Sequence, residues 1–299
     1  MNPYLDELLS RPTNLPTVPA VVQQVLETFG DPDVSLAEVG RRISMDPVIA
    51  AKLLRLANSA YYRARREIRS VDEALQLLGM TTVRNVVLGC GFKDAFAPVP
   101  GLDLRALWRH GVRTACAARW LGRELRLDAE FAFTASLMLG LGQLLLHKAL
   151  PDRVRQIDAL VRVHAPGRAA VEQRALNFNF AEVSAALAER WTLPSSLAMT
   201  LAAVPAPLST QPFQPVAACV QLAGWTMWRQ ELEGAQGSYD SGEYPGAVAA
   251  ALGLWEGWWP QALDGVAGAT AGAAGPAVSA RARMPDATEL TAGLEELMA

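Results

Sequence analysis

The sequence predicts an all-α fold, and three features of its 299 residues carry that prediction. Apolar residues recur with the 3.6-residue period of a helix, as in "VVQQVLETF" at 21–29. Helix-capping residues precede several such segments, and no stretch shows the apolar–polar alternation of a half-buried strand. With 51% hydrophobic and 19% charged residues, the chain can bury a large core.

Capping residues locate the starts of several helices. Three pairs have the spacing of a capping box, in which each side chain bonds the other residue's backbone amide: Ser35 with Glu38, Ser70 with Glu73, and Asn179 with Glu182. Asp46, which precedes Pro47, is expected to end one helix and cap the next. Asp103 and Asp128 are expected to cap two long helices, and Gly79 is placed like a helix C-cap.

The stretch "AFTASLMLGLGQLLLH" at 132–147 is apolar on nearly every side of a helix. Such a helix is typical of a domain centre, where neighbours cover every face. Its unbroken apolar run falls short of the roughly 20 residues that cross a bilayer, so we expect a buried helix and no membrane insertion. The segment "GLGQ" at 140–143 could be a phosphate-binding loop or a site of close helix packing. We favour packing, because Gly140 and Gly142 would let neighbouring helices approach closely.

Charge and cysteine usage narrow the function classes. A net charge of −3 argues against a surface that binds nucleic acid throughout. The start "MNPYLDELLSRP" has no signal-peptide pattern. Cys90, Cys116 and Cys219 are far apart and lack a CxxC spacing, which predicts free buried thiols without zinc or redox chemistry. We therefore expect a cytoplasmic protein without a cofactor.

Four segments, taken together and in order, resemble the HDOD domain, an output domain related to the HD metal phosphohydrolases. They are "LPTVPAVVQQVLETFGDPDVSLAEVGRRISMDPVIAAKLLRLANSAYY", "SVDEALQLLGMTTVRNVVL", "FTASLMLGLGQLLL" and "FAEVSAALAERWTLP". The resemblance covers roughly residues 15 to 231, and its most specific part is "DPVIAAKLLRLANSAYY" at 46–62. It implies a two-lobed helical fold in a bacterial signal-transduction protein of a family generally regarded as non-catalytic.

With this resemblance the chain divides into five parts. Residues 1–14 form a lead-in helix, 15–96 the N-terminal helical lobe, and 97–233 the lobe that is similar to HD phosphohydrolases. Residues 234–266 read as a loop and a Trp-rich extension. The low-complexity stretch "AGATAGAAGPA" opens 267–299, a predicted linker that ends in a short amphipathic helix able to dock in a groove.

The related enzymes hold their metals through a His, an adjacent His-Asp pair and a later Asp. The resemblance aligns these ligands with His110, Leu139, Gly140 and Gly224, and aligns a further family His with Phe180. Only His110 has a side chain that can bind a metal. We therefore expect no metal and no catalytic residue, with His110 bonded to a neighbouring polar group.

Two further positions of the HD pattern, and the remaining histidines, support the same expectation. Gln143 replaces a lysine that often follows the His-Asp pair, and Val204 and Pro205 replace a later His-rich segment. Nothing in the sequence places His110, His147 and His164 near one another. No GxSxG, Walker-type, GxGxxG or HExxH motif offers another catalytic centre.

A basic segment at 52–69 is a candidate binding site. It contains six basic residues and one acid, Glu67, and two tyrosines that are available for stacking. The candidate binding residues are Lys52, Arg55, Tyr61, Tyr62, Arg63, Arg65, Arg66 and Arg69. Such a cluster can bind the phosphates of a nucleotide second messenger or a nucleic acid. The alternative, which the charge pattern favours, is a solvated loop that pairs with acids of the other lobe.

A second candidate surface is the aromatic group Trp255, Trp258 and Trp259. Exposed, it would form a docking patch, because aromatic residues are enriched at interface centres. More commonly such residues attach a terminal segment to the core.

The sequence thus favours a non-catalytic helical module that acts on an unidentified protein partner in bacterial signalling. A binder of a nucleotide or nucleic acid through 52–69 is the alternative, and a residual metal-dependent phosphohydrolase is a weaker one. The partner and the oligomeric state are not fixed by the sequence.

Overall fold

A computed structural model describes residues 3–10, 35–58, 66–95, 99–191, 193–233 and 243–254. Every regular element in these ranges is helical, so the predicted all-α class is confirmed. The first four helices are α1 (Pro3–Ser10), α3 (Leu36–Ser44), α4 (Pro47–Ala57) and α5 (Val71–Ala95). The remaining helices are α6 (Leu104–Glu124), α7 (Ala129–Ala149), α8 (Pro151–Asp158), α9 (Arg168–Leu176), α10 (Phe180–Arg190), α11 (Ser195–Ala203), the 3-10 turn η2 (Pro207–Ser209), α12 (Pro215–Glu233) and α13 (Gly246–Ala251).

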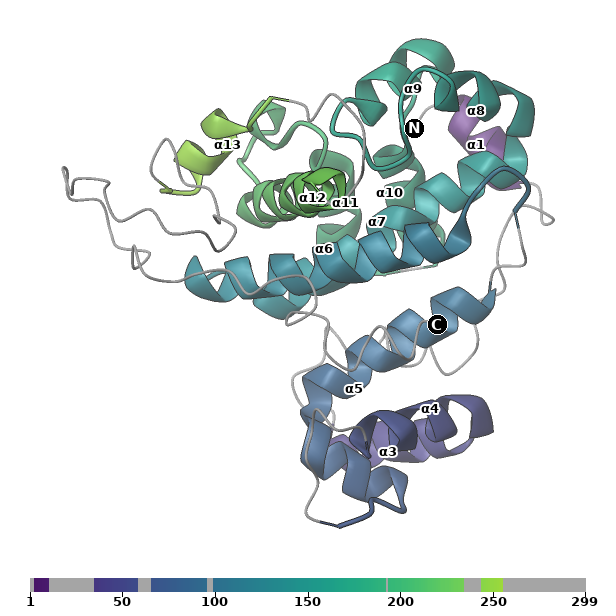
Figure 1. Ribbon diagram of the computed structural model, residues 1–299, viewed down its shortest axis with the longest axis vertical. Coiled ribbons are helices and arrows are strands. Elements are labelled where there is room, and N and C mark those ends of the chain that lie inside the picture. Colours follow the sequence, from purple (N-terminus) through teal and green to yellow (C-terminus); the bar gives the residue numbers. More distant parts are fainter. Residues whose placement is uncertain are drawn as a thin grey trace.

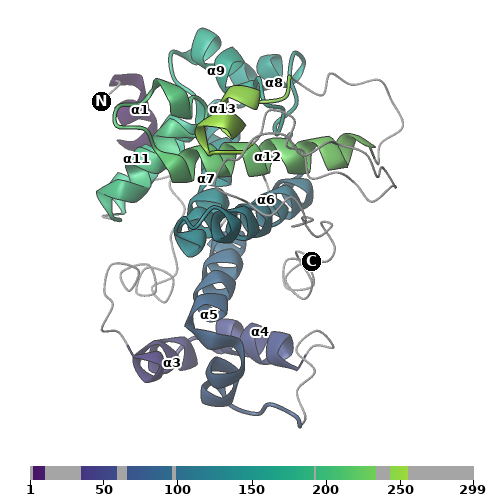
Figure 2. The same cartoon turned by 90° about the vertical axis from the view of Figure 1, so that its left-hand side faces the viewer.

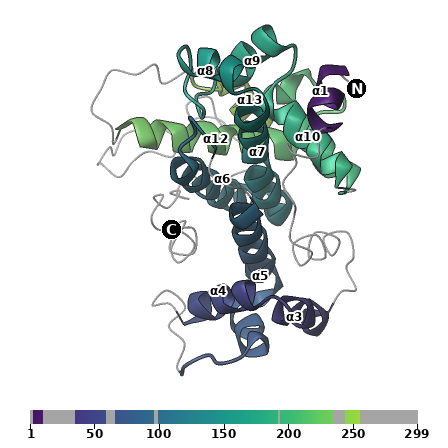
Figure 3. The same cartoon turned by 90° about the vertical axis from the view of Figure 1, so that its right-hand side faces the viewer.

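The helices form two lobes, as the sequence predicts. Helices α3 and α4 pack against the start of α5 in a small lobe, and α5 extends from it to α7 of the large lobe (Figures 1 and 2). Helix α1 does not join the small lobe but packs on α10 of the large lobe (Figure 3). Its leucines Leu5, Leu8 and Leu9 are buried there, so the chain's first helix belongs to the large lobe's core.

Helix α5 is interrupted at Gly79, where the backbone adopts φ 77° and ψ 160°. Only glycine adopts this conformation without strain, because a Cβ would clash with the backbone. The predicted helix end at Gly79 therefore marks a real break, after which the chain resumes as a second helical stretch. This break re-aims the second stretch of α5 toward the large lobe.

Helix α7 is the centre of the large lobe, in contact with α5, α6, α8, α10, α11 and α12. It is the one described helix long and apolar enough to cross a membrane, and 72% of its most apolar window is buried inside the protein. Its close approach to α10 depends on Gly142, whose N–H donates to Ser184 Oγ at 2.9 Å. A Cβ on Gly142 would overlap the carbonyl oxygen of Phe180, so the predicted packing role of this glycine is observed.

Most predicted caps form. Asp103 and Asp128 accept from the backbone amides of Ala106 and Phe131 at 3.0 and 2.9 Å, and Asp46 caps α4 through Ile49. The capping box of Asn179 and Glu182 is complete. The pair Ser70–Glu73 differs from a capping box, because the Glu73 carboxylate accepts from the N–H of Arg69.

The described part of the C-terminal extension, residues 243–254, packs on the large lobe. Ala249 and Leu254 join a small apolar cluster with Leu121 of α6 and with Cys219 and Leu222 of α12. Burial raises the pKa of the Cys219 thiol to about 12, as expected for an inert structural cysteine. Cys116 is likewise a buried free thiol, whereas the side chain of Cys90 lies outside the description.

Candidate functional site

The large lobe contains a cavity of about 260 Å³ between α6, α7 and α12. The loop before α9 closes one side, and the residues after α11 and the segment around Pro245 close another. The apolar part of its lining consists of Leu107, Gly111, Leu139, Gly140, Val163, Ala165, Pro166, Ala169, Phe180, Val204, Pro205, Val220, Gly224, Trp225 and Pro245. The polar part consists of His110, Thr114, Ser136, Gln143, His164, Gln221 and Glu243.

The positions that the HD resemblance singles out all meet in this cavity. His110, Leu139, Gly140, Phe180 and Gly224 line it together, although they come from four helices. A Cβ built on Gly140 would meet no heavy atom within 4 Å, so there is open space where an aspartate side chain would project. No group of three His, Cys, Asp or Glu side chains that could hold a metal occurs among the described residues.

His110 is held by neighbouring polar groups, as the sequence analysis expects. Its Nδ1 lies 3.2 Å from both carboxylate oxygens of Glu231, and its Nε2 lies 3.3 Å from Thr114 Oγ1. These contacts occupy both ring nitrogens of His110, the one residue among the positions aligned with HD ligands whose side chain could bind a metal. They fix the ring against the wall of the cavity.

The expectation that nothing brings the histidines together is wrong for one pair. The rings of His110 and His164 stack with centroids 3.9 Å apart and planes 15° apart. His164 lies on the loop before α9, and the fold closes this loop over α6. Burial and the nearby charges of His110, Arg168 and Arg109 hold the pKa of His164 well below its ordinary value, so its ring is neutral at pH 7.

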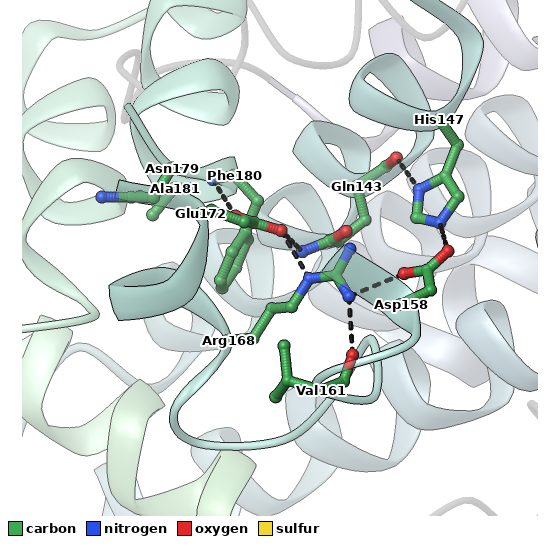
Figure 4. Close-up of polar contacts among 9 residues, drawn as sticks. All are labelled: Gln143, His147, Asp158, Val161, Arg168, Glu172, Asn179, Phe180 and Ala181. Carbon is green, nitrogen blue, oxygen red and sulfur yellow. Dashed lines mark hydrogen bonds and ion pairs between the residues drawn. The ribbon is translucent and has the colours of Figure 1, made fainter. Parts of the chain in front are cut away.

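A buried polar network lies beside the cavity (Figure 4). At its centre are Arg168 and Glu172, one turn apart on α9 and 1% and 0% exposed. Arg168 Nε donates to Glu172 Oε1 at 2.6 Å, and Gln143 Nε2 of α7 donates to the same oxygen at 2.8 Å. The backbone N–H of Phe180 donates to Glu172 Oε2 at 2.8 Å. This carboxylate therefore joins α7, α9 and the start of α10.

The other end of the network reaches α8. Arg168 Nη1 donates to Asp158 Oδ1 at 2.7 Å and to the carbonyl oxygen of Val161 at 2.8 Å (Figure 4). Asp158 Oδ2 lies 3.2 Å from His147 Nε2, and His147 Nδ1 lies 2.7 Å from the carbonyl oxygen of Gln143. The sequence analysis missed this network. The spacing of Arg168 and Glu172 at i and i+4 is the one signal that could have indicated it.

Two glutamine side chains of the cavity wall are oriented by acceptors. Gln143 Nε2 faces the Glu172 carboxylate, and Gln221 Nε2 donates to the carbonyl oxygen of Pro205 at 2.9 Å. Because a carboxylate or carbonyl oxygen can only accept, the amide N–H group of each glutamine must face it. The Oε1 atoms of both residues are buried and have no hydrogen-bond partner among the described residues.

The basic segment is only partly described, and its predicted ligand binding stays a prediction. Arg66 pairs with Glu73 at 3.1 Å and Arg69 with Glu67 at 2.9 Å, so these two arginines bond to acids of their own lobe and not, as expected, to acids of the other lobe. The N–H of Arg69 and the charge of Arg66 lower the pKa of the Glu73 carboxyl. Lys52 and Arg55 lie on α4. Four of the candidate binding residues of this segment fall outside the described ranges, as does the predicted Trp docking patch: Tyr61, Tyr62, Arg63, Arg65, Trp255, Trp258 and Trp259.

Comparison with known proteins agrees with this fold. The model of the HDOD domain family matches residues 15–207, and the chain belongs to that family. A crystal structure of an HDOD domain protein with unknown function from Geobacter sulfurreducens is 26% identical, with a TM-score of 0.67, and the match covers 79% of this chain and 80% of that one.

Two other relatives are similar to this chain over most of its length. A proposed phosphohydrolase from Shewanella amazonensis SB2B is 27% identical in a match over 83% of this chain and 88% of that chain, with a TM-score of 0.66. An uncharacterised protein of Treponema pallidum (strain Nichols) is 23% identical over 196 residues, which are 65% of this chain and 38% of that protein. The chain thus spans well under half of that relative's length.

Proposed function

We propose that this chain is a non-catalytic regulatory module of bacterial signalling that acts by binding a protein partner. The single observation that supports it most is the lining of the cavity. Four of the five positions aligned with the HD ligands or with a further family His carry leucine, glycine or phenylalanine, which have no side-chain ligand to offer. The fifth, His110, is bonded to Glu231 and Thr114.

Hydrolysis by the HD enzymes requires a metal that lowers the pKa of a bound water. One imidazole does not supply the three or four ligands that hold such an ion. The surrounding fold is nevertheless intact, because α7 contacts six other helices and the Arg168–Glu172 network joins its neighbours. Retention of the scaffold without the ligands favours binding over chemistry.

Hydrolysis is the first activity to test, because one relative is a proposed phosphohydrolase. The purified chain would be loaded with Mn²⁺, analysed for bound metal, and assayed with bis(4-nitrophenyl) phosphate and a cyclic dinucleotide. We expect no stoichiometric metal and no turnover above the buffer rate. Turnover that requires Mn²⁺ and disappears in His110→Ala would contradict the proposal, since a contaminating enzyme would not respond to that substitution.

The partner is tested separately by affinity capture from a bacterial lysate. We expect a protein to be retained in stoichiometric amount by the wild type and equally by the double variant Arg66→Glu/Arg69→Glu. Loss of capture in that variant would instead point to the basic segment as the binding surface. Absence of any retained protein would count against a partner-binding role.

The alternative, binding of a nucleotide or nucleic acid at 52–69, has a direct test of its own. Fluorescence anisotropy with labelled cyclic dinucleotide and short RNA would be measured at increasing salt. Because Arg66 and Arg69 are already paired with Glu73 and Glu67, we expect no saturable signal. Salt-sensitive saturation that the Arg66→Glu/Arg69→Glu variant abolishes would establish this alternative.

A further inference from the structure

His147 is a buried titratable residue in the last turn of α7, and both nitrogens of its ring face acceptor atoms (Figure 4). Nδ1 lies 2.7 Å from the carbonyl oxygen of Gln143, and Nε2 lies 3.2 Å from Asp158 Oδ2. The side chain is 3% exposed, so solvent reaches almost none of it. The ring therefore depends on these two partners within the protein.

The two contacts indicate how many protons the ring carries. A neutral imidazole has one N–H donor and one lone pair, whereas an imidazolium has two N–H donors. A backbone carbonyl oxygen and an ionised carboxylate oxygen can only accept. A neutral His147 would therefore aim its lone pair at Gln143 or at Asp158, and only the imidazolium satisfies both contacts.

The charges of the neighbouring network favour the same protonation state. Asp158 Oδ1 accepts from Arg168 Nη1 at 2.7 Å, and Arg168 Nε donates to Glu172 at 2.6 Å. The guanidinium favours an ionised Asp158 over a protonated one, which would donate to the ring. With an imidazolium, two positive and two negative side chains alternate along these contacts. With a neutral ring, one negative charge is left without a positive partner.

The contact lies where α7, α8 and α9 meet. Asp158 is the last residue of α8 and Arg168 is the first of α9, and the loop between them closes one side of the cavity. In the part of the chain that the structure describes, His147 forms its ion pair with Asp158, and its neighbour Lys148 is exposed. The contact between His147 and Asp158 therefore joins α8 and this loop to α7.

We propose that the contact between His147 and Asp158 is a proton-dependent latch, which holds α8 and the loop before α9 on α7 while the ring carries two protons. Loss of one proton releases them. Because the folded state favours the charged ring, the stabilisation is complete below the ordinary histidine value of about pH 6.5 and is lost as the pH rises. This sign is opposite to that of His164, whose pKa is lowered in the folded state.

The number of protons on the ring is measured by long-range ¹H–¹⁵N NMR of the full chain labelled with ¹⁵N-histidine. The chain has three histidines, so the His147 signals are identified by their absence in His147→Gln. If that variant fails to fold, His110→Gln and His164→Gln identify them by elimination. We expect two protonated nitrogens at pH 6 and one at pH 9. A ring with one proton at pH 6, or with both at pH 9, would overturn the inference.

The release of α8 is measured by hydrogen exchange with mass spectrometry, with rates corrected for the intrinsic effect of pH. We expect the protection of α8 to fall at least about fivefold from pH 6 to pH 8, since one proton changes an equilibrium by at most about tenfold per pH unit. His147→Gln, which cannot gain the charge, should remove this dependence. His110→Gln and His164→Gln, which remove the other two histidines, should retain it.

Two results of the exchange experiment would overturn the latch. The first is protection of α8 that does not change with pH in the wild type, and the second is an equal change in His147→Gln. The latch is a property beyond the proposed partner binding. A hydrolytic activity or a missing protein partner would overturn the proposed function instead and would leave this result unaffected.

Discussion

Two regions lie beside helix α7, the Arg168–Glu172 network and the cavity. They differ in whether they contain a buried pair of opposite charges. In the network a guanidinium and a carboxylate are almost completely buried and bonded to each other. In the cavity the positions aligned with the metal ligands of the related enzymes carry leucine, glycine and phenylalanine, and His110 alone among them has an imidazole. Gln143 belongs to both regions, since it donates to Glu172 and lines the cavity.

The difference shows what this chain requires of its buried polar groups. Charge is present where it joins helices, because Glu172 bonds residues of α7, α9 and α10 at once. Charge is missing where its role in the related enzymes is to hold a metal. A buried charge persists when every partner is in place and is costly when one is removed. The two regions should therefore respond oppositely to substitution.

The largest effect is expected from removing the positive charge of the network. Arg168→Met leaves the carboxylate of Glu172 buried without its guanidinium, which should lower the free energy of unfolding by about 3–5 kcal/mol in urea denaturation. The matched control is Arg155→Met, which breaks the exposed pair with Asp152 and should cost less than about 1 kcal/mol. Equal losses in the two variants would mean that burial does not set the strength of this network.

The next largest effect is expected on the closely packed side of α7. Gly142→Ala places a methyl group against the carbonyl oxygen of Phe180 and within 2.6 Å of Ser184 Oγ. Because backbone has to move, we expect a loss of about 3 kcal/mol in the free energy of unfolding. Unchanged stability would show that α10 can move away from α7 without cost.

Acidification should act on the cavity wall through His164. Its pKa is lowered in the folded state, so the unfolded chain binds the extra proton, and stability is complete above the ordinary histidine pKa of about 6.5. Stability is then lost as the pH falls below that value, by at most about 1.4 kcal/mol per pH unit from this one group.

The measurement compares wild type with His164→Gln in urea at a series of pH values. The charged and titratable neighbours named with His164, which are His110, Arg109 and Arg168, stay in place in both proteins. We expect a shallower fall in the variant. Parallel profiles would mean that other groups cause the acid sensitivity.

The smallest effect, with the opposite sign, is expected at Gly140. Alanine is a better helix former than glycine, and its methyl group would enter the open cavity. Gly140→Ala should therefore raise the free energy of unfolding by about 1 kcal/mol or less. Set beside Gly142→Ala, two residues away on the same helix, it separates the open side of α7 from the closed side. A loss as large as that of Gly142→Ala would show that the cavity is not open at this position.

Much of the fold was predictable because its signals are local. A cap such as Asp128 depends on residues within one turn, and the break at Gly79 depends on the backbone freedom of a single residue. The central position of α7 follows from its own composition. The resemblance to the HDOD family, which the family match over residues 15–207 confirms, aligned His110, Leu139 and Gly140 with ligands of one metal site before any geometry was known.

Long-range contacts were not predictable in the same way. His110 and Glu231 are 121 residues apart, and the stack of His110 on His164 depends on how the loop before α9 closes over α6. Neither periodicity nor residue spacing indicates such a contact, so the sequence did not predict that two histidines would be neighbours. The network of Arg168, Asp158 and His147 was not predicted for the same reason, since each residue type on its own is typical of a protein surface.

The sequence by itself determined which side chains are missing at the positions aligned with the metal ligands of the related enzymes, because the identity of an aligned residue decides whether it can donate a lone pair. It also determined the helices, since period and capping act over a few residues. Only the tertiary structure decided that a cavity lies at these positions and that the Oε1 atoms of Gln143 and Gln221 have no partner in the part of the chain that the structure describes. Whether space is filled and whether a polar atom is bonded depend on the distances between elements far apart in the chain.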